Sequence, residues 1–348
     1  MRLSVSILIS AVALLVVPIA ASDSGPAIGG KAPAFEAQDQ SGQSHSLQSL
    51  LGSKGAVILF YQSADWCPYC KAQLVELEQN REAFAKQGLG VAAISYDSVA
   101  ILHNFAERRG IHFPLLSDGD SKIIRAFGVL NEAVETSNPF YGAARPGSFV
   151  LDSNGVIVAK YFENDFKERY TSASLLLRQF GVMPPSGGTE AHGKQLTASA
   201  IASNSTVHGF QRITLAIDIQ MNANTHVYAP GVSGYIPIEW KMTDAYLSTP
   251  RDITFPKPEV LYLKAIDEKA PVFQDHFRLI RDITLAGDDR LTALLDGSGN
   301  FKIGGTLRYQ ACDDRLCYVP QELPLQWTFH YEPFDSLRVP AELQRKGH

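Results

Sequence analysis

The stretch Trp66-Cys67-Pro68-Tyr69-Cys70 joins an apolar run at residues 56–61 to a helical pattern that begins at Lys71. Two cysteines separated by two residues can close a small disulfide in the first turn of a helix, where unpaired backbone N–H groups stabilise a thiolate. Pro68 suits this turn because the N–H that proline lacks has no helical partner there. The stretch predicts a redox-active pair, with Cys67 exposed, Cys70 partly buried behind it, and Lys71 a solvated helix charge.

Strands and helices alternate around this pair. The sequence predicts strands at 56–61 and 91–96, and helices at 71–86, 99–109, 121–127 and 172–180. Residues 147–152 and 156–162 flank Ser153-Asn154-Gly155, a strong signal for a hairpin turn. Such alternation predicts an α/β domain over residues 25–181, with a parallel core sheet covered on both faces.

The chain changes character after residue 181. Residues 182–195 are rich in proline, glycine and polar residues, which is typical of a linker. Beyond them hydrophobic residues recur at every second position, as in Ile213, Leu215, Ile217 and Ile219, and again in Leu323, Leu325, Trp327 and Phe329. This period predicts an all-β sandwich of short antiparallel strands over residues 196–331, followed by a polar tail at 332–348.

Composition and the amino terminus indicate where the protein works. The net charge of -5 and the charged content of 19% leave no basic surface for nucleic acid. Residues 1–21 combine Arg2, an apolar run from Val5 to Ala20 and small residues, which is the layout of a signal peptide. An uncleaved membrane anchor is the alternative. We therefore expect a periplasmic or secreted protein, in a compartment where its four cysteines can form disulfides.

The first domain resembles the redoxin branch of the thioredoxin superfamily, which includes AhpC/TSA and TlpA-like proteins. The matching pieces are Ala32-Pro33-Ala34-Phe35, the stretch 66–70, and Arg145-Pro146-Gly147-Ser148-Phe149. The resemblance implies a thioredoxin-like fold and a catalytic pair, Cys67 and Cys70, supported by Trp66, Pro68, Tyr69 and Pro146. It also implies a cis Arg145–Pro146 bond that packs against the disulfide.

Three other interpretations of the first pair stay open. A peroxidase would use Cys67 as the peroxidatic and Cys70 as the resolving residue, but Phe60 and Ala64 stand where true peroxiredoxins carry proline and threonine or serine. An inert disulfide is disfavoured because so small a ring adds little loop-closure entropy. A zinc site would require the two cysteine pairs to meet across the domains. We predict no metal and no other cofactor.

Cys312 and Cys317 form a second close pair, between strands expected at 306–311 and 323–329. Tyr-Gln-Ala-Cys at 309–312, followed by Cys-Tyr-Val-Pro at 317–320, resembles the N-terminal domain of the thiol:disulfide interchange protein DsbD. The resemblance implies an immunoglobulin-like sandwich whose cysteines pass electrons to other proteins, capped by a short aromatic loop that we place at 262–271. A structural disulfide at a hairpin end is the alternative. His226 and Tyr228 are interpreted as packing residues.

Together these features predict an exported thiol–disulfide oxidoreductase. Cys67 attacks a partner disulfide, Cys70 resolves the mixed disulfide, and Cys312 and Cys317 exchange electrons with the first pair or with partner proteins. The expected partners are protein thiols and disulfides, together with an external electron donor such as a membrane thiol–disulfide relay. A binding module with a structural carboxy-terminal disulfide is the remaining alternative.

Overall fold

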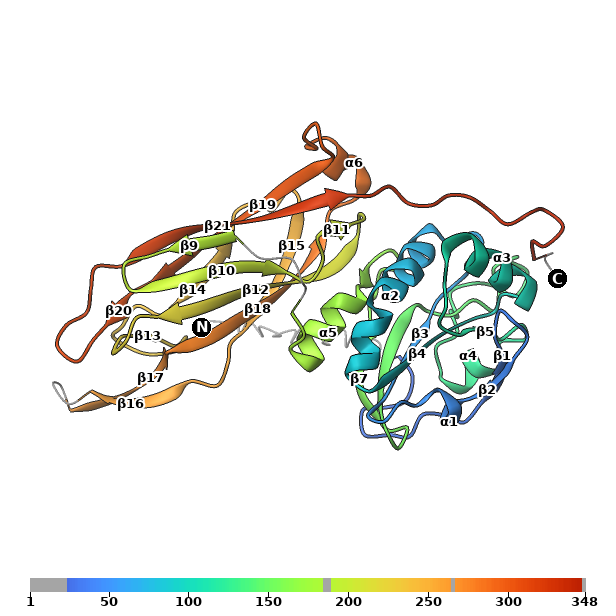
Figure 1. Ribbon diagram of the computed structural model, residues 1–348, viewed down its shortest axis with the longest axis horizontal. Helices are drawn as coiled ribbons and strands as arrows, with labels where there is room; N and C mark the ends of the chain where they lie inside the picture. Colours follow the sequence, from blue (N-terminus) through green and yellow to red (C-terminus); the bar gives the residue numbers. More distant parts are fainter. Residues whose placement is uncertain (1–23, 184–188, 264–266, 346–348) are drawn as a thin grey trace, which may run out of the picture.

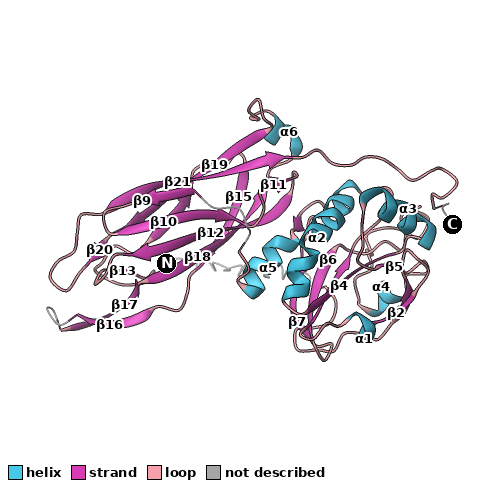
Figure 2. Cartoon of the chain, viewed as in Figure 1, coloured by secondary structure: helices cyan, strands magenta, loops and turns pink. Residues whose placement is uncertain are grey.

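The computed structural model describes residues 24–183, 189–263 and 267–345, so the expected signal peptide at 1–21 lies outside the described residues. Two bodies of different secondary structure lie side by side (Figures 1 and 2). Helices and strands build the first, and strands build nearly all of the second. The predicted order, a thioredoxin-like α/β domain followed by a β-sandwich, is confirmed. Within the described ranges, no helix is long and apolar enough to span a membrane.

Seven strands form the sheet of the first domain. They are β1 (Glu36–Gln38), β2 (Ser44–Ser46), β3 (Gly55–Phe60), β4 (Leu89–Ser95), β5 (Leu115–Ser117), β6 (Gly147–Asp152) and β7 (Ile157–Phe162). β4 and β5 pair in parallel, whereas β3 with β6, β6 with β7, and β1 with β5 pair antiparallel. The core sheet is therefore mixed and not parallel as predicted. The alternation of strands and helices does not determine whether β6 pairs with β3 in the parallel or the antiparallel direction.

Five helices cover this sheet, and the longer ones match their predicted positions. They are α1 (Leu47–Leu50), α2 (Pro68–Lys86), α3 (Val99–Arg109), α4 (Lys122–Ala126) and α5 (Ser172–Phe180). Ser98 and Thr171 accept hydrogen bonds from the first turns of α3 and α5, which end at the left-handed Gly110 and Gly181. α2 and α5 pack together on the side that faces the second domain (Figure 1).

Three groups of strands form the sandwich. The first contains β9 (Thr189–His192), β10 (Leu196–Ala202), β12 (Gln211–Met221), β15 (Ser248–Thr254) and β18 (His276–Leu285). The second contains β11 (Thr206–Val207), β14 (Glu239–Met242), β19 (Asn300–Tyr309) and β21 (Gln321–Tyr331), with the short α6 (Asp288–Thr292) before β19. The third contains β13 (His226–Tyr228), β16 (Glu259–Leu263), β17 (Glu268–Gln274) and β20 (Ala311–Cys312). The alternating apolar residues predicted to face inward, from Ile213 and from Leu323 onward, share one buried core.

A short strand of the first domain pairs with a strand of the second. β8 (Arg169–Tyr170) belongs to the first domain and pairs in parallel with Gln211 and Arg212 at the start of β12. Next to it, Leu177 of α5 packs against Ile201 and Ala216 of the sandwich. The first domain thus adds an edge to a sheet of the second, so the domains are docked and not only tethered.

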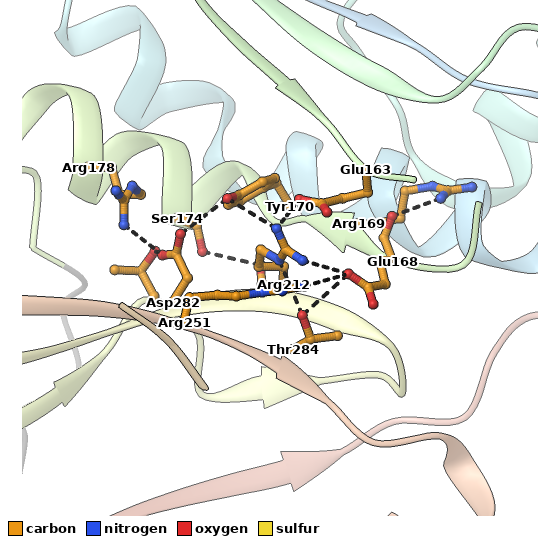
Figure 3. Close-up of polar contacts among 11 residues, drawn as sticks. Glu163, Glu168, Arg169, Tyr170, Ser174, Arg178, Arg212, Arg251, Asp282 and Thr284 are labelled. Carbon is orange, nitrogen blue, oxygen red and sulfur yellow. Dashed lines mark hydrogen bonds and ion pairs between the residues drawn. The ribbon is translucent and has the colours of Figure 1, made fainter. Parts of the chain in front are cut away.

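Polar contacts and the linker region complete this junction. Arg212 lies between Glu163 and Glu168 of the first domain (Figure 3). Of the predicted linker at 182–195, residues 189–192 form β9 and pair with β10, and residues 184–188 lie outside the described residues. The chain after β21 returns over α2 to the first domain and ends beside α3 (Figure 1).

Candidate functional site

The first cysteine pair lies after strand β3, at the amino terminus of helix α2. Cys67 and Cys70 are joined by a disulfide, and Cys67 is the residue that caps the amino terminus of α2. Its sulfur accepts the backbone N–H of Cys70 at 3.2 Å, and Gln62 Oε1 lies 3.5 Å from the same sulfur. An N–H donor and the positive end of the helix both favour a thiolate at Cys67 over a thiol.

Both cysteines are buried, which corrects the expected exposure of Cys67. Cys67 is 1% exposed and Cys70 is not exposed at all. The carboxy-terminal segment, residues 332–345, lies against the neighbours of the pair: its Phe334 ring packs edge-on against Tyr69 at 4.8 Å, and Val339 donates its N–H to Asp65. The segment's contacts with Lys71 and Asp65 join residues that are 266 and 273 positions apart, so they leave no local signal in the sequence around Cys67. The expected exposure was therefore wrong for a tertiary reason.

Lys71 is covered by the same segment. Its side chain is 1% exposed, and its Nζ donates to the Leu337 carbonyl at 2.9 Å and lies 3.9 Å from Asp335. Burial lowers the pKa of Lys71, and the Asp335 carboxylate opposes that effect. The interpretation of Lys71 as a solvated helix charge was therefore wrong.

The aromatic neighbours of the pair hold separate contacts. Trp66 donates its indole N–H to the Tyr96 hydroxyl at 2.9 Å and packs against Phe140. Pro68 takes the first position of α2, as expected. Tyr69 lies among rings from both domains and the carboxy-terminal segment, Phe166, Phe210 and Phe334. The site thus lies at the junction of the two domains.

Pro146 is buried at the start of β6, but its peptide bond is trans. No cis peptide bond occurs within 24–183, 189–263 or 267–345, so the expected cis Arg145–Pro146 bond is wrong for this structure. The trans form is favoured by about 0.5–1 kcal/mol even before proline. Here the preceding chain is also fixed, because Arg145 donates its N–H to the Val129 carbonyl and Ala144 bridges to Leu130.

A buried carboxyl group lies next to the turn that leads into the cysteines. Asp97 accepts hydrogen bonds from the Ala64 N–H at 2.7 Å and from the hydroxyls of Ser63 and Ser95. Burial raises the pKa of Asp97 to about 6, and the three hydrogen bonds offset only part of that rise. A proton is therefore taken up within the physiological range directly behind residues 63–65.

The substitution Asp97→Asn is expected to flatten the pH dependence of stability between pH 4 and pH 7. Because the folded-state pKa lies above the ordinary 3.8, the folded chain holds a proton that the unfolded chain releases, so this contribution is complete below about pH 4 and is lost as the pH rises through 6. A rise from 3.8 to about 6 corresponds to about 3 kcal/mol. The measurement is the free energy of unfolding in urea at pH 4.5 and at pH 7.5, in the wild type and in the variant. The matched control is Asp120→Asn, since Asp120 is exposed and its hydrogen bond from Lys122 holds its pKa below the ordinary value. Equal slopes for the two variants would contradict the assignment.

The second cysteine pair closes the loop after β20. Cys312 and Cys317 form a disulfide in which Cys312 is buried and Cys317 is exposed. Asp313 organises the loop between them by accepting the N–H groups of Arg315 and Leu316 and the Tyr318 hydroxyl. These hydrogen bonds, with that of Tyr318 the largest, lower the pKa of Asp313 to about 2. The loop is therefore ordered by its own side chain and presents one sulfur to solvent.

Beside Cys317 lies a cavity of about 520 Å³ with mainly apolar walls. Its lining includes Tyr228, whose hydroxyl lies 4.0 Å from the Cys317 sulfur and whose ring stacks on Tyr235 at 4.0 Å. Tyr262 and Leu263, from the loop expected at 262–271, also line it, and residues 264–266 lie outside the described residues. That segment belongs mostly to the β16–β17 hairpin. The segment predicted at 262–271 therefore does contribute to the wall of this cavity, but it forms part of a hairpin and not a loop.

His226 lies directly across from Cys312 in the β13–β20 pairing. Its Nε2 is buried without a hydrogen-bond partner among the described residues, and burial lowers its pKa, so the ring is neutral at pH 7. The interpretation of His226 and Tyr228 as packing residues thus missed that both flank the disulfide. Their alternation was visible in the sequence, but the neighbouring strand was not.

The first disulfide lies near one end of strand β12 and the second near the other end. β12 begins next to Phe210, which contacts Tyr69, and ends where Met221 donates to the Asp275 carbonyl, near the second pair (Figure 1). Eleven extended residues span about 35 Å. The four sulfurs do not meet, which excludes the zinc site that needed both pairs. Within the described ranges, no group of three or more His, Cys, Asp or Glu side chains is placed to hold a metal.

Each of the two domains matches a known protein family. Residues 28–160 match the model of the AhpC/TSA family, and residues 195–325 match that of the N-terminal domain of thiol:disulfide interchange protein DsbD. Peroxiredoxin Bcp of Escherichia coli K12 is 34% identical over 136 residues, which cover 39% of this chain and 84% of that protein. The chloroplastic peroxiredoxin Q of Sedum lineare is 31% identical over 153 residues, covering 43% and 77%. The crystal structure of peroxidoxin BcpB from Mycobacterium tuberculosis is 26% identical, covers 40% of this chain and 88% of its own, and has a TM-score of 0.37.

These matches agree with the resemblances on which the two cysteine motifs were interpreted. The E. coli relative is matched over more than four fifths of its length at more than 30% identity, and the second model begins at the predicted end of the linker. The chain therefore belongs to the AhpC/TSA family of thiol oxidoreductases and carries, after that domain, a second one of the DsbD N-terminal family.

Proposed function

We propose that the protein is an exported thiol–disulfide oxidoreductase with two separate redox sites. The observation that carries this proposal is the second disulfide, because Cys317 is exposed and lines a cavity whose walls are mainly apolar. A disulfide that serves only as a staple needs neither an exposed sulfur nor a cavity beside it. Export rests on the layout of residues 1–21 alone.

At the first site the electrons move by two exchange steps. The Cys67 thiolate attacks one sulfur of a partner disulfide, forms a mixed disulfide and releases the first partner thiolate, which takes up a proton. The Cys70 thiolate then attacks the Cys67 sulfur and releases the second partner thiolate. The partner gains two electrons and this chain is left with the Cys67–Cys70 disulfide. A dithiol protein must reduce that disulfide before the next cycle.

The second site exchanges with partner proteins and not directly with the first site. Strand β12, about 35 Å long, runs between the two sites, and the docked junction fixes the orientation of the domains. The Cys70→Ser, Cys312→Ser double variant leaves Cys67 and Cys317 as single thiols. In a mild thiol buffer we expect buffer adducts at both, because neither sulfur can reach the other. A disulfide between Cys67 and Cys317 within one chain would instead support a direct relay through domain rearrangement.

The reduction potential of Cys312–Cys317 decides between a redox role and a structural one. Structural disulfides of secreted proteins have potentials below about -300 mV, whereas exchanging pairs lie above it. We expect the second pair to be reduced above this limit because Cys317 is open to an attacking thiolate. Mass spectrometry of the alkylated protein, equilibrated in thiol buffers of defined potential, measures the value. A potential below the limit would overturn the proposal for this site and leave a structural disulfide.

Peroxide reduction is the second candidate function of the first site. It is favoured by the relatives in the comparison, which are named as peroxiredoxins. In this chemistry Cys67 is oxidised to a sulfenic acid, one peroxide oxygen leaves as water, and Cys70 condenses with the sulfenic acid to give the disulfide and a second water. Consumption of hydrogen peroxide in the presence of a dithiol, lost in Cys67→Ser, would support it, and no consumption above background would exclude it.

A further inference from the structure

The carboxy-terminal segment is tied to the sandwich just before it crosses to the first domain. Glu332 donates its N–H to the Val207 carbonyl at 2.9 Å, and its own carbonyl lies 2.7 Å from His208 Nδ1. The next ring, Phe334, stacks on His208 with the ring centres 5.0 Å apart. Contacts with the sandwich therefore fix the position at which the segment starts, next to the amino terminus of α2.

The middle of the segment contacts residues on both sides of Cys67. Two residues before it, Asp65 accepts two hydrogen bonds from the Arg338 guanidinium, at 2.7 and 2.5 Å, and the N–H of Val339 at 2.9 Å. Four residues after it, Lys71 donates to the Leu337 carbonyl at 2.9 Å. Asp65 and Lys71 are almost fully buried by these contacts. The segment thus runs as an extended chain across the cysteine pair.

The far end of the segment is held by its charges. The guanidinium of Arg345 lies 4.2 Å from the centre of the Tyr96 ring and donates to the Tyr96 carbonyl at 3.1 Å. Nearer its start, Asp335 pairs with Arg108 and Arg109 at the end of α3. Attractive pairs therefore hold the segment to the first domain along its whole described length.

The segment nevertheless lacks the backbone pairing and the burial of a strand in a sheet. Within the described ranges, no backbone-to-backbone hydrogen bond joins residues 333–345 to another part of the chain. Val339 is its only fully buried side chain, and residues 336–338 and 340–342 are exposed. A few side-chain contacts on a mostly exposed stretch are lost far more easily than a packed strand.

We propose that residues 333–345 form a removable strap that occupies the surface on which a protein partner of Cys67 must dock. A thiolate attacks a disulfide only where the two sulfurs can meet, and under the strap the Cys67 sulfur is closed to a protein. The strap also indicates what that surface accepts, namely an extended peptide with a basic side chain placed to pair with Asp65. The identity of the occupant as a redox partner rests on the proposed function, whereas the blocking itself does not.

Alkylation of the reduced protein tests the strap directly. The rate at which iodoacetamide modifies Cys67, measured by mass spectrometry, is compared in the full chain and in a chain that ends at Glu332. We expect at least a tenfold faster rate in the shortened chain, and a severalfold faster rate in Arg338→Ala. Glu342→Gln, an exposed change within the same segment, should leave it unaltered. Cys317, exposed in the same molecule, is the internal reference. Equal Cys67 rates in the full chain, the shortened chain and Arg338→Ala would overturn the proposal.

A peptide added in trans tests what the surface accepts. A synthetic peptide of residues 333–345 should slow the alkylation of Cys67 in the shortened chain, and the same peptide with Arg338→Glu should not. Equal protection by both peptides would contradict pairing with Asp65. Failure of the proposed function is seen separately: if the shortened chain is alkylated rapidly but reduces no protein disulfide, the strap stands and the reductase does not.

Discussion

Replacing Cys67 by serine is expected to lower the rate of protein-disulfide reduction at least about a thousandfold, since removal of an attacking nucleophile leaves little residual catalysis. Cys67 is assigned this role because its sulfur caps α2 and accepts the Cys70 N–H at 3.2 Å, so that its thiolate is the one the helix stabilises. The measurement is the turnover of an oxidised model protein with a dithiol as reductant, in the chain that ends at Glu332 so that access does not limit the rate.

Cys70→Ser is the matched control, because it makes the same chemical change three residues away. Without a resolving thiol the first exchange still occurs, and we expect the mixed disulfide between Cys67 and the partner to accumulate. Near-ultraviolet circular dichroism should show both variants folded. If Cys70→Ser lost the first exchange while Cys67→Ser retained it, the two roles would be reversed.

The sequence predicted what depends on neighbouring residues. α3 and α5 have the expected bounds because capping hydroxyls and terminal glycines mark their ends. The sandwich followed from a period of two that places Ile213 to Ile219 on one buried face. The two cysteine pairs were recognised from short motifs, because a disulfide between close residues is a local feature.

What the sequence missed depends on contacts between distant residues. Asp65 and Arg338 are 273 residues apart, and neither belongs to a periodic pattern, so nothing near Cys67 announced its burial. The place of β13 beside β20 was equally hidden, and with it the position of His226 opposite Cys312. A charged residue that is solvated in an isolated helix, as expected for Lys71, becomes buried when a remote segment supplies its partner.

Replacing Arg212 by methionine is expected to cost about 3–5 kcal/mol in the free energy of unfolding and to separate the unfolding of the two domains. Arg212 is 7% exposed, and its guanidinium pairs with Glu163 and, at 2.6 Å, with Glu168 of the first domain (Figure 3). Loss of the cation leaves Glu163, which is 13% exposed, without the main charge that opposes its burial, and this is the costly way to break a buried ion pair. Calorimetry should show one transition in the wild type and two in the variant.

Arg251→Met is the matched control, since Arg251 is 48% exposed and lies 3.5 Å from the same Glu168. An exposed pair contributes at most about 1 kcal/mol, so this variant should keep a single transition.

The pH dependence of stability in Arg212→Met distinguishes the contribution of the charge from that of packing. Burial already raises the pKa of Glu163, and Arg212 is the main charge opposing that rise. In Arg212→Met the carboxyl therefore takes up its proton at higher pH, and the deficit in stability should shrink between pH 8 and pH 5 as that proton is bound. A deficit that stayed constant over this range would mean that the side chain joins the domains by packing on Tyr170 and not by its charge.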